Sequence, residues 1–393
     1  MKKIKKIIAV FTVAVMMMAT LAGCGGSSSA SNGKILWLAN LSSGAQYDFY
    51  VAYFEMVCDE LGYDFGVIYG DPMNDPAGNL KAVKDAMTSD VKGLIASQDG
   101  GIADILEEYP DLFVVGFMTD ALSVFGEGDA ATSAAAKTNP NFLGTVADGF
   151  VSGADQGSLY AQEVISKGYK KVSTIVFPAF AYPSLTEADT QFRADIAAYN
   201  ATASTADQIT IVNDEPTVLM FAALDPSYFL EDGYDDLDCV VGFLAGVSFI
   251  YPTLITAQAD GSCSADTKLI TSGFENNADI LADTGDDGTI SCISVASFET
   301  CIYPMVLLDN AIQGKQFSDL TTQAIDSPVY VMDSTASLNK VVDDSAATSL
   351  DFTKLSLSWE DAKTYFTRYN GDATYADLTA LMASDKLTVA GIK

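Results

Sequence analysis

Residues 34–69 read KILWLANLSSGAQYDFYVAYFEMVCDELGYDFGVIY. This stretch contains a short apolar run, a segment with helical periodicity and a second apolar run. In the middle segment, apolar residues recur three and four positions apart between Val51 and Leu61, which places them on one face of a helix. Gly62 follows, and glycine is the residue at which helices commonly end. The stretch therefore predicts a strand, a helix and a second strand, the unit from which parallel sheets with crossover helices are built.

The same alternation continues along the chain, where ten apolar runs bounded by turn residues are predicted to be strands. The first five are Ile35–Ala39, Phe65–Tyr69, Gly93–Ala96, Phe113–Phe117 and Phe142–Val146, and the second five are Val172–Phe177, Ile209–Val212, Cys239–Leu244, Leu269–Thr271 and Ile290–Val295. Two series of five strands indicate two similar lobes. The fold class we expect is α/β, with two doubly wound parallel-sheet lobes. Near the end of the chain, apolar residues at helical spacing from Trp359 to Tyr369 predict one more amphipathic helix, packed on the body.

Composition excludes several classes of function. With 393 residues, the chain has room for about two domains, and its hydrophobic fraction of 49% excludes wholesale disorder. The formal charge is -31, from 21 basic and 52 acidic residues, so a nucleic acid is not an expected partner. The chain has no histidine. Ser-His-Asp, Cys-His and histidine-metal chemistry are therefore excluded.

The N-terminus has the features of an exported, anchored protein. Four lysines lie within the first six residues, and an apolar stretch from Ile7 to Ala22 follows, which is typical of a secretory signal rather than of a membrane span. Leu21-Ala22-Gly23-Cys24 resembles a bacterial lipobox, and this implies cleavage before Cys24 and attachment of lipid to its thiol. We expect a signal peptide over residues 1–23, a lipidated cysteine with a flexible linker over 24–33, and a mature chain on the outer face of the cytoplasmic membrane.

Five cysteines remain after such cleavage, at positions 58, 239, 263, 292 and 301. An odd number outside the cytoplasm leaves at least one thiol unpaired. Cys58 and Cys239 lie in apolar patterns, where the expected role is a small buried hydrophobe. A disulfide among Cys263, Cys292 and Cys301 stays open. No Cys-x-x-Cys spacing supports a zinc site, and we expect no metal.

Five short motifs occur along the body in a fixed order. They are Gly44-Ala45-Gln46-Tyr47 ahead of Leu61-Gly62-Tyr63, Asn74-Asp75-Pro76, Asp148 with Gly153, Gly273-Phe274-Glu275, and the segment from Asn310 to Lys315. In this order and spacing, residues 34–333 resemble the type I periplasmic-binding-protein family. These are the solute-binding lipoproteins of ABC importers, and the resemblance is greatest to their sugar-binding branch.

The resemblance implies a lobe of residues 34–147 with 300–326, and a second lobe of 148–299 with 327–393 that includes the helical tail. It also implies a three-segment hinge, capture of a small-molecule ligand by closure, and delivery to the transmembrane subunits of an ABC permease, without catalysis or a cofactor. Independently, crevices in doubly wound sheets open at the carboxyl ends of the strands. Because the high charge opposes self-association, we expect a monomer.

Loops that follow the predicted strands supply the candidate ligand-binding residues. Carboxylates and amides bind sugar hydroxyls, and aromatic rings cover the C–H face of a sugar. The candidates are Gln46, Tyr47, Asp99, Asp120, Asp148, Phe180, Glu275 and Glu299. By the resemblance, Tyr47 matches a stacking aromatic, Glu275 a cleft aspartate and Glu299 a polar ligand near the hinge. For each polar residue the alternative is a solvated loop or a helix cap, and Phe180 has the alternative of packing between the lobes.

Three departures from the family pattern bear on the ligand. Gln46 replaces a stacking aromatic, Leu244-Ala245 replaces an Asn-Asp pair, and the helix that carries Phe192 lacks an arginine at its start. These losses argue against a pentose or hexose bound in the usual manner. They favour a more apolar or aromatic solute, including a nucleoside.

Other functions stay open at this point. Asp48-Phe49-Tyr50 and Phe54-Glu55 resemble the first helix of purine-nucleoside-binding lipoproteins of the basic-membrane-protein type. A ligand-presenting module for a sensor kinase would have the same sequence features. A secreted hydrolase could use two carboxylates, such as Asp99 with Glu275.

Overall fold

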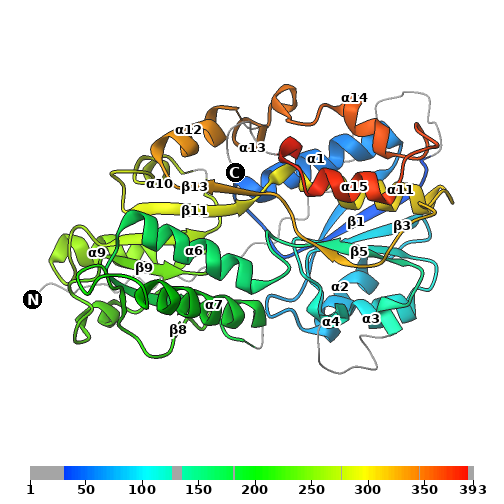
Figure 1. The fold of residues 1–393 in the computed structure, drawn as a ribbon. Coiled ribbons are helices and arrows are strands. Elements are labelled where there is room, and N and C mark those ends of the chain that lie inside the picture. Colours follow the sequence, from blue (N-terminus) through cyan, green and yellow to red (C-terminus); the bar gives the residue numbers. More distant parts are fainter. Residues whose placement is uncertain (1–30, 126–134, 180–181, 276, 345, 388–393) are drawn as a thin grey trace, which may run out of the picture. The chain divides into compact units, whose positions relative to one another are not determined.

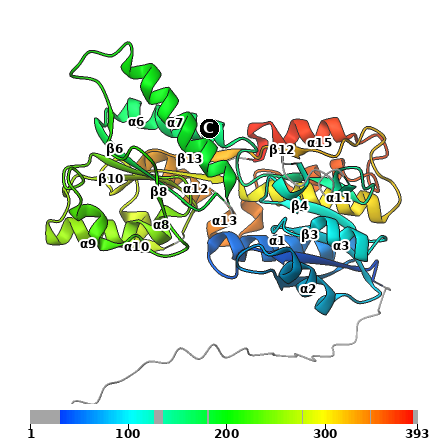
Figure 2. The same cartoon turned by 90° about the horizontal axis from the view of Figure 1, so that it is seen from below.

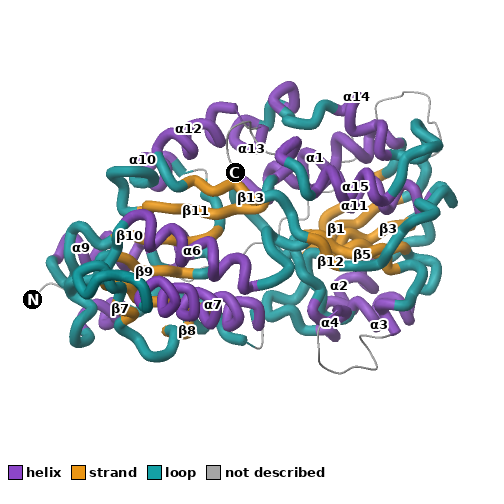
Figure 3. Tube along the Cα trace, in the orientation of Figure 1, coloured by secondary structure: helices purple, strands orange, loops and turns teal. Residues whose placement is uncertain are grey.

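The computed structural model describes residues 31–125, 135–179, 182–275, 277–344 and 346–387. In these residues the chain forms two separate sheets, one of six strands and one of seven (Figures 1 and 3). The predicted signal peptide, Cys24 and Phe180 lie outside the described residues. Within the described ranges, no helix combines the length and apolar character needed to cross a membrane.

The first sheet has the strand order β12-β5-β4-β3-β1-β2, and all its neighbouring strands are parallel. Its strands are β1 (Lys34–Ala39), β2 (Asp64–Tyr69), β3 (Val91–Ala96), β4 (Phe113–Phe117), β5 (Phe142–Val146) and β12 (Ala324–Ile325). The helices associated with it are α1 (Ala45–Leu61), α2 (Pro76–Ala86), α3 (Ile102–Glu108), α4 (Leu122–Phe125) and α11 (Ile302–Ile312).

Helices cover both faces of this sheet, and β1 shows how the sequence achieves it. Successive side chains of a strand point to opposite faces. Ile35 and Trp37 lie in one buried cluster with residues of α1 and α11, whereas Leu36 and Leu38 lie in another with residues of α2 and α3. Figure 1 shows α2 and α3 on the other side of the strands from α11. Because both faces are buried, β1 is apolar throughout instead of alternating, as is typical of parallel strands.

The second sheet has the strand order β13-β11-β10-β9-β6-β7, with β8 also paired to β6. Its strands are β6 (Lys171–Val176), β7 (Thr210–Ile211), β8 (Thr217–Val218), β9 (Cys239–Gly242), β10 (Lys268–Ser272), β11 (Ile290–Ala296) and β13 (Val329–Met332). Its helices are α6 (Gly153–Lys167), α7 (Pro183–Asn200), α8 (Gly246–Phe249), α9 (Tyr251–Asp260), α10 (Ala278–Ala282) and α12 (Thr335–Asp344). All pairs are parallel except β13, which runs antiparallel to β11.

Helices α6 and α7 lie side by side (Figure 2) because glycine allows a close approach. A Cβ on Gly157 would lie 2.2 Å from the carbonyl oxygen of Ala188 in α7. Any larger residue at this position would force the two helices apart.

The chain passes between the two sheets three times up to β13. It crosses after β5, returns after β11, and crosses again between β12 and β13. The expected α/β class with two mostly parallel sheets is therefore confirmed, and the antiparallel β13 is the exception.

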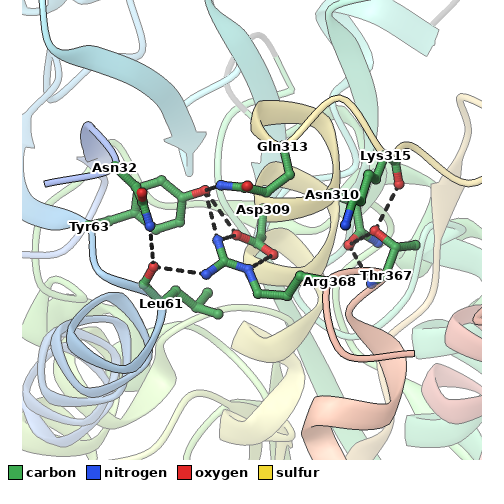
Figure 4. A network of polar contacts seen from close by, with 9 residues as sticks. All are labelled: Asn32, Leu61, Tyr63, Asp309, Asn310, Gln313, Lys315, Thr367 and Arg368. Atoms are coloured by element: carbon green, nitrogen blue, oxygen red, sulfur yellow. Dashed lines mark hydrogen bonds and ion pairs between the residues drawn. The ribbon is translucent and has the colours of Figure 1, made fainter. Parts of the chain in front are cut away.

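The C-terminal segment, residues 352–387, packs against elements of the first sheet's lobe. The ring of Phe352 lies 6.0 Å from that of Phe49 in α1, and the hydroxyls of Tyr375 and Tyr303 lie 3.0 Å apart. Arg368 pairs with Asp309 of α11 (Figure 4). The division expected from the resemblance assigned 327–393 to the second lobe, but these contacts join the segment to the first. Since α12 packs on β13, the chain crosses between the lobes a fourth time, after α12.

The five described cysteines are all free and buried. No disulfide joins Cys263, Cys292 and Cys301, so the pairing left open by the sequence does not form among the described residues. Burial raises the pKa of each of the five thiols.

Candidate functional site

Five strands of the first sheet end along one edge, and most of the expected residues follow them. Neighbouring parallel strands lie about 4.8 Å apart, so loops at their carboxyl ends are neighbours too. In the order of the sheet, Asp148 follows β5, Asp120 follows β4, Asp99 follows β3, Gln46 lies in the first turn of α1 after β1, and Tyr69 ends β2. We call this row the carboxyl edge of the first sheet.

Asp99 ties three of these loops together. Its Oδ1 accepts a hydrogen bond from Nδ2 of Asn74 at 2.6 Å, and its Oδ2 accepts one from the backbone N–H of Ser123 at 2.9 Å. Both carboxylate oxygens therefore bond within the chain. These contacts support a positioning role for Asp99 more than direct contact with a ligand.

The carboxylate of Asp120 accepts fewer side-chain and backbone hydrogen bonds from other residues than that of Asp99 does. Its Oδ1 accepts a 3.3 Å hydrogen bond from the backbone N–H of Leu122. Burial, and next the charge of Asp99, raise the pKa of the Asp120 carboxyl to about 6. Asp120 is thus an acceptor whose charged form gains from any donor that comes near.

Asp148 lies where the chain first leaves the first sheet. Its side chain is exposed to solvent, yet desolvation by the surrounding protein raises its pKa to about 6. Burial and then the charge of Asp148 raise the pKa of Tyr50 in α1 and of Tyr182 at the start of α7. Asp148 is therefore near both lobes.

An aromatic stack lies at the other end of the carboxyl edge. The rings of Trp37 and Tyr47 are stacked with centroids 5.7 Å apart, and Tyr69 continues the stack 6.5 Å from Tyr47. The hydroxyls of the two tyrosines lie 2.7 Å apart, and Tyr69 is 52% exposed. Burial, and next this hydrogen bond, raise the pKa of Tyr47 to about 12. Sequence reasoning missed Tyr69, although its place as the last residue of a predicted strand could have indicated it.

The second sheet has an aromatic cluster at the corresponding ends of its strands. The ring centroid of Phe177, after β6, lies 5.7 Å from that of Phe221 and 5.1 Å from that of Phe249. The ring centroid of Tyr182 lies 6.0 Å from that of Phe177. Glu275, after β10, accepts a 2.8 Å hydrogen bond from the hydroxyl of Ser248 in α8. Tyr182 and Glu275 both retain exposed surface.

Glu299 does not resemble a ligand-binding group in its contacts. It is 4% exposed, and its two oxygens accept backbone hydrogen bonds from Ser356 at 2.7 Å and Leu357 at 3.0 Å. Burial raises its pKa to about 7. This arrangement fixes the C-terminal segment beside the hinge. It favours a structural role over the ligand contact expected from the sequence.

Backbone strain gathers at the same strand ends. Five residues other than glycine adopt a positive φ in loops after strands, and these are Asn74, Met118, Ala121, Phe221 and Ala245. Such conformations cost about 1–3 kcal/mol each and persist where function requires a particular loop geometry. They lie at the carboxyl ends of strands in both sheets.

A cavity of about 690 Å³ lies beside the hinge, lined by Val151, residues 324–329 and residues of α15 (Tyr375–Met382) and the turn after it. None of the expected ligand-binding residues lines this cavity. In the described part of the chain, no group of three or more Cys, Asp or Glu side chains could hold a metal ion.

No protein-family model and no curated protein matches the sequence. Solved structures do match. An arabinose binding protein from Geobacillus stearothermophilus has a TM-score of 0.55, 15% identity, and coverage of 78% of this chain and 98% of that one. An ABC transporter solute binding protein from Agrobacterium vitis, bound to α-D-tagatopyranose, has a TM-score of 0.57, 13% identity, and coverage of 81% and 98%. The chain has the type I periplasmic-binding-protein fold.

This fold is not confined to transport proteins. A putative ribose operon repressor from Burkholderia thailandensis matches with a TM-score of 0.53 at 14% identity, over 77% of this chain and all of that one. By their descriptions, these type I proteins are binding proteins and a repressor rather than enzymes. At such low identity the likeness shows the fold alone, so the ligand has to be argued from the site.

Proposed function

We propose that this chain is an extracytoplasmic solute-binding lipoprotein of an ABC importer, and that it captures a small sugar-like solute between the carboxyl edges of its two sheets. The observation that carries the proposal is the position of Asp148. Its carboxyl group follows a strand of the first sheet and acts electrostatically on Tyr50 of the first lobe and Tyr182 of the second. A solute bound to Asp148 would therefore contact both lobes.

The residues present suit capture by closure. Carboxyls at Asp120, Asp148 and Glu275 offer acceptors for hydroxyl groups, and the rings of Tyr69 and Phe221 offer faces for C–H surfaces. A bound solute stabilises whichever lobe arrangement brings both edges into contact with it. No chemical step is needed.

Anchoring follows from the sequence beyond the described residues. Cleavage before Cys24 and lipid attachment to its thiol would place the binding fold on the outer face of the membrane, beside the permease. Cys24→Ser should shift the protein from the membrane to the soluble fraction and abolish incorporation of a labelled fatty acid. Membrane retention of Cys24→Ser would contradict this part of the proposal.

A nucleoside is the second candidate ligand. The aromatic groups at the ends of both sheets favour it, since a purine base presents two flat faces and a sugar presents a rougher one. A nucleoside would bind in this way only if the aromatic residues of the first sheet and those of the second sheet contact the same molecule.

The test is a thermal-shift screen of the soluble chain from Gly25 onward against pentoses, hexoses, cyclic polyols and nucleosides. A ligand at 100 times its Kd adds about 2.7 kcal/mol of stability, enough to raise Tm by several degrees. A sugar or polyol hit that is lost in Asp148→Ala supports the main proposal, and a nucleoside hit would move the assignment to the second. A hit that is unaffected by Asp148→Ala would place the solute elsewhere.

A further inference from the structure

The loops after β2 and β3 touch each other backbone to backbone at the carboxyl edge of the first sheet. A Cβ on Gly100 would lie 2.1 Å from the carbonyl oxygen of Asn74, and one on Gly101 would lie 2.7 Å from that of Pro76. A side chain at either position would push the two loops apart. Glycine at both positions therefore allows the two loops to pack directly on each other.

Asn74 joins these two loops through its side chain. Its Oδ1 accepts hydrogen bonds from the backbone N–H of Gly100 at 2.9 Å and from Nδ2 of Asn79 at 3.0 Å. Its Nδ2 donates to Oδ1 of Asp99 at 2.6 Å. Because the oxygen and the nitrogen have different partners, the amide cannot turn over without losing hydrogen bonds. The backbone of Asn74 has a φ of 56°, a left-handed conformation that asparagine and aspartate adopt more readily than most residues.

Asn79 fixes both loops to α2. Its side chain is fully buried, and its Oδ1 accepts a hydrogen bond from the backbone N–H of Asp71 at 2.7 Å. Its Nδ2 donates to the backbone carbonyl of Gly100 at 3.0 Å as well as to Asn74. A buried amide that loses such partners leaves polar groups unpaired, which is costly. The position of Asn74 is therefore held from the helix as well as from the loops.

Asp99 extends the network to the connection between β4 and α4. Its Oδ2 accepts a hydrogen bond from the backbone N–H of Ser123 at 2.9 Å, and its backbone carbonyl accepts one from the hydroxyl of Ser123 at 2.6 Å. Asp120 lies between β4 and Ser123, so these bonds hold the short connection that carries Asp120. The two acids differ in their use. Both oxygens of Asp99 bond within the chain, whereas Asp120 accepts the 3.3 Å hydrogen bond from Leu122 and keeps capacity for a solute hydroxyl.

We propose that Asn74 and Asp99 are positioning residues for solute capture: the hydrogen bond from Nδ2 of Asn74 to Oδ1 of Asp99 joins the loops after β2, β3 and β4 into one unit, which presents Asp120 to the solute. The inference rests on the proposed function, because it concerns the same site. In this arrangement the Asp99 carboxylate is an acceptor for the chain itself and does not contact the solute. Asn74 is required for its carboxamide.

A reciprocal exchange of the two side chains tests the proposal. Asn74→Asp alone sets two carboxylates against each other. Asp99→Asn alone sets two amides against each other, so one hydrogen bond of the network is lost. In the double variant, Asn74→Asp with Asp99→Asn, the new amide can donate to the new carboxylate while all other donors of the network keep an acceptor. The exchange restores the hydrogen bonds and moves the negative charge from position 99 to position 74, where aspartate tolerates the left-handed backbone.

Two measurements on the soluble chain from Gly25 follow the exchange. Hydrogen exchange by NMR reports on the backbone N–H groups of Gly100 and Ser123, and one or both should exchange about tenfold faster in each single variant and recover in the double variant. Calorimetry measures the affinity for D-ribose, L-arabinose, D-glucose, D-galactose, myo-inositol and adenosine. The probe that the wild type binds most tightly should bind about tenfold more weakly in each single variant, and within about threefold of wild type in the double variant. Asn139→Asp is the matched control: it adds the same charge before β5, where aspartate can accept the same hydrogen bond from the N–H of Asn141, and it should change neither result.

Three results would overturn the positioning role while the solute-binding function stands. Weaker binding that the double variant does not recover, although hydrogen exchange recovers, would mean that the Asp99 carboxylate itself contacts the solute. Faster exchange with unchanged affinity would mean that the network orders the loops without serving capture. Unchanged exchange in both single variants would mean that the pair does not hold the loops. If the wild-type chain binds none of the six probes, the proposed function fails and the positioning role fails with it.

Discussion

Arg368 and Asp309 form an ion pair that fixes the C-terminal segment to α11 (Figure 4). Nε of Arg368 donates to Oδ2 of Asp309 at 2.8 Å, and Nη2 donates to Oδ1. Nη1 of the same guanidinium donates to the carbonyl of Leu61 at the end of α1. The Asp309 side chain has no exposed surface, so compensation of its charge depends on Arg368 and on the hydroxyl of Tyr63.

Arg368→Met should lower the free energy of unfolding by about 3–5 kcal/mol, because it leaves a buried carboxylate without its cation. Guanidinium denaturation of the soluble chain measures this. Lys363→Met is the matched control in the same segment, since its partner Glu360 is 81% exposed, and it should cost no more than about 1 kcal/mol. The double variant Arg368→Met with Asp309→Leu should recover most of the loss. If Arg368→Met and Lys363→Met lower the free energy of unfolding by the same small amount, the Arg368–Asp309 pair does not stabilise the fold.

The C-terminal segment also contacts the passages between the two sheets. The backbone carbonyl of Leu387, near the end of the segment, accepts hydrogen bonds from the hydroxyls of Ser297 and Tyr330. Ser297 lies on the passage after β11 and Tyr330 on β13, so the segment contacts hinge passages as well as the first lobe. Glu299 adds two bonds from Ser356 and Leu357 to the same region.

The charged carboxyl of Asp148 should lower the free energy of unfolding of the unliganded protein at neutral pH. Its pKa rises from an ordinary value of 3.8 to about 6 on folding, so the folded state holds the proton more tightly than the unfolded state. The stability from this proton is present at pH 4 and is lost as the pH rises through 6. Asp148→Asn should match the wild type near pH 4 and exceed it in stability at pH 7.5.

Denaturation curves at pH 4.5, 6 and 7.5 measure the difference between Asp148→Asn and wild type. Taking the difference cancels the titration of the other carboxyls. Asp111→Asn, at an exposed position, should give a difference near zero at all three values. A difference for Asp148→Asn that does not grow with pH would mean that the folded state does not penalise its charge.

The sequence was sufficient for the fold because its strands are simple apolar runs. Each of the ten predicted strands is present, and the run around Ile209 is reduced to the two residues of β7. The short β8, β12 and β13 were not predicted, since two to four residues give too little period to recognise.

The C-terminal segment could not be predicted in this way. Spacing from Trp359 to Tyr369 predicts one helix, but the helix α14 ends at Ala362 and a short 3-10 turn follows. The backbone N–H and hydroxyl of Thr367 both donate to Oδ1 of Asn310, 57 residues earlier in the chain. This long-range contact takes the backbone out of the helix, and local periodicity carries no information about it.

The same limit applies to the site. Asp120, Asp148 and Tyr47 were chosen as candidates because loops after parallel strands share an edge, and the structure places all three at the carboxyl edge of the first sheet. Asp99 and Glu299 are also acidic residues that follow strands. The carboxylate of Asp99, however, accepts hydrogen bonds from Asn74 and Ser123. The carboxylate of Glu299 accepts hydrogen bonds from Ser356 and Leu357. Whether a loop carboxylate meets a ligand or a backbone amide depends on distant segments that sequence patterns do not place.

The buried cysteines give a prediction about accessibility. Since Cys58, Cys239, Cys263, Cys292 and Cys301 are all free and buried, the native soluble chain should show no fast reaction with a thiol reagent. Unfolding in guanidinium without a reductant should release five thiols per chain. Three thiols after unfolding would reveal a disulfide, and a rapidly reacting thiol in the native chain would show that one of the five is accessible.

The last prediction separates the ring of Tyr47 from its hydroxyl. Tyr47→Phe keeps the face stacked on Trp37 and removes the hydrogen bond to Tyr69, so affinity for the solute should change by less than about threefold. Tyr47→Ala removes the ring that stacks between Trp37 and Tyr69, so the exposed Tyr69 loses its support, and affinity should fall tenfold or more. Leu230→Ala, at a position that is 71% exposed in the second lobe, controls for loss of a large side chain and should leave affinity unchanged. Calorimetry with the tightest-binding solute from the screen measures all three variants. Equal losses in Tyr47→Phe and Tyr47→Ala would mean that the hydroxyl, and not the ring, meets the solute, and the stack would then be part of the core of the lobe.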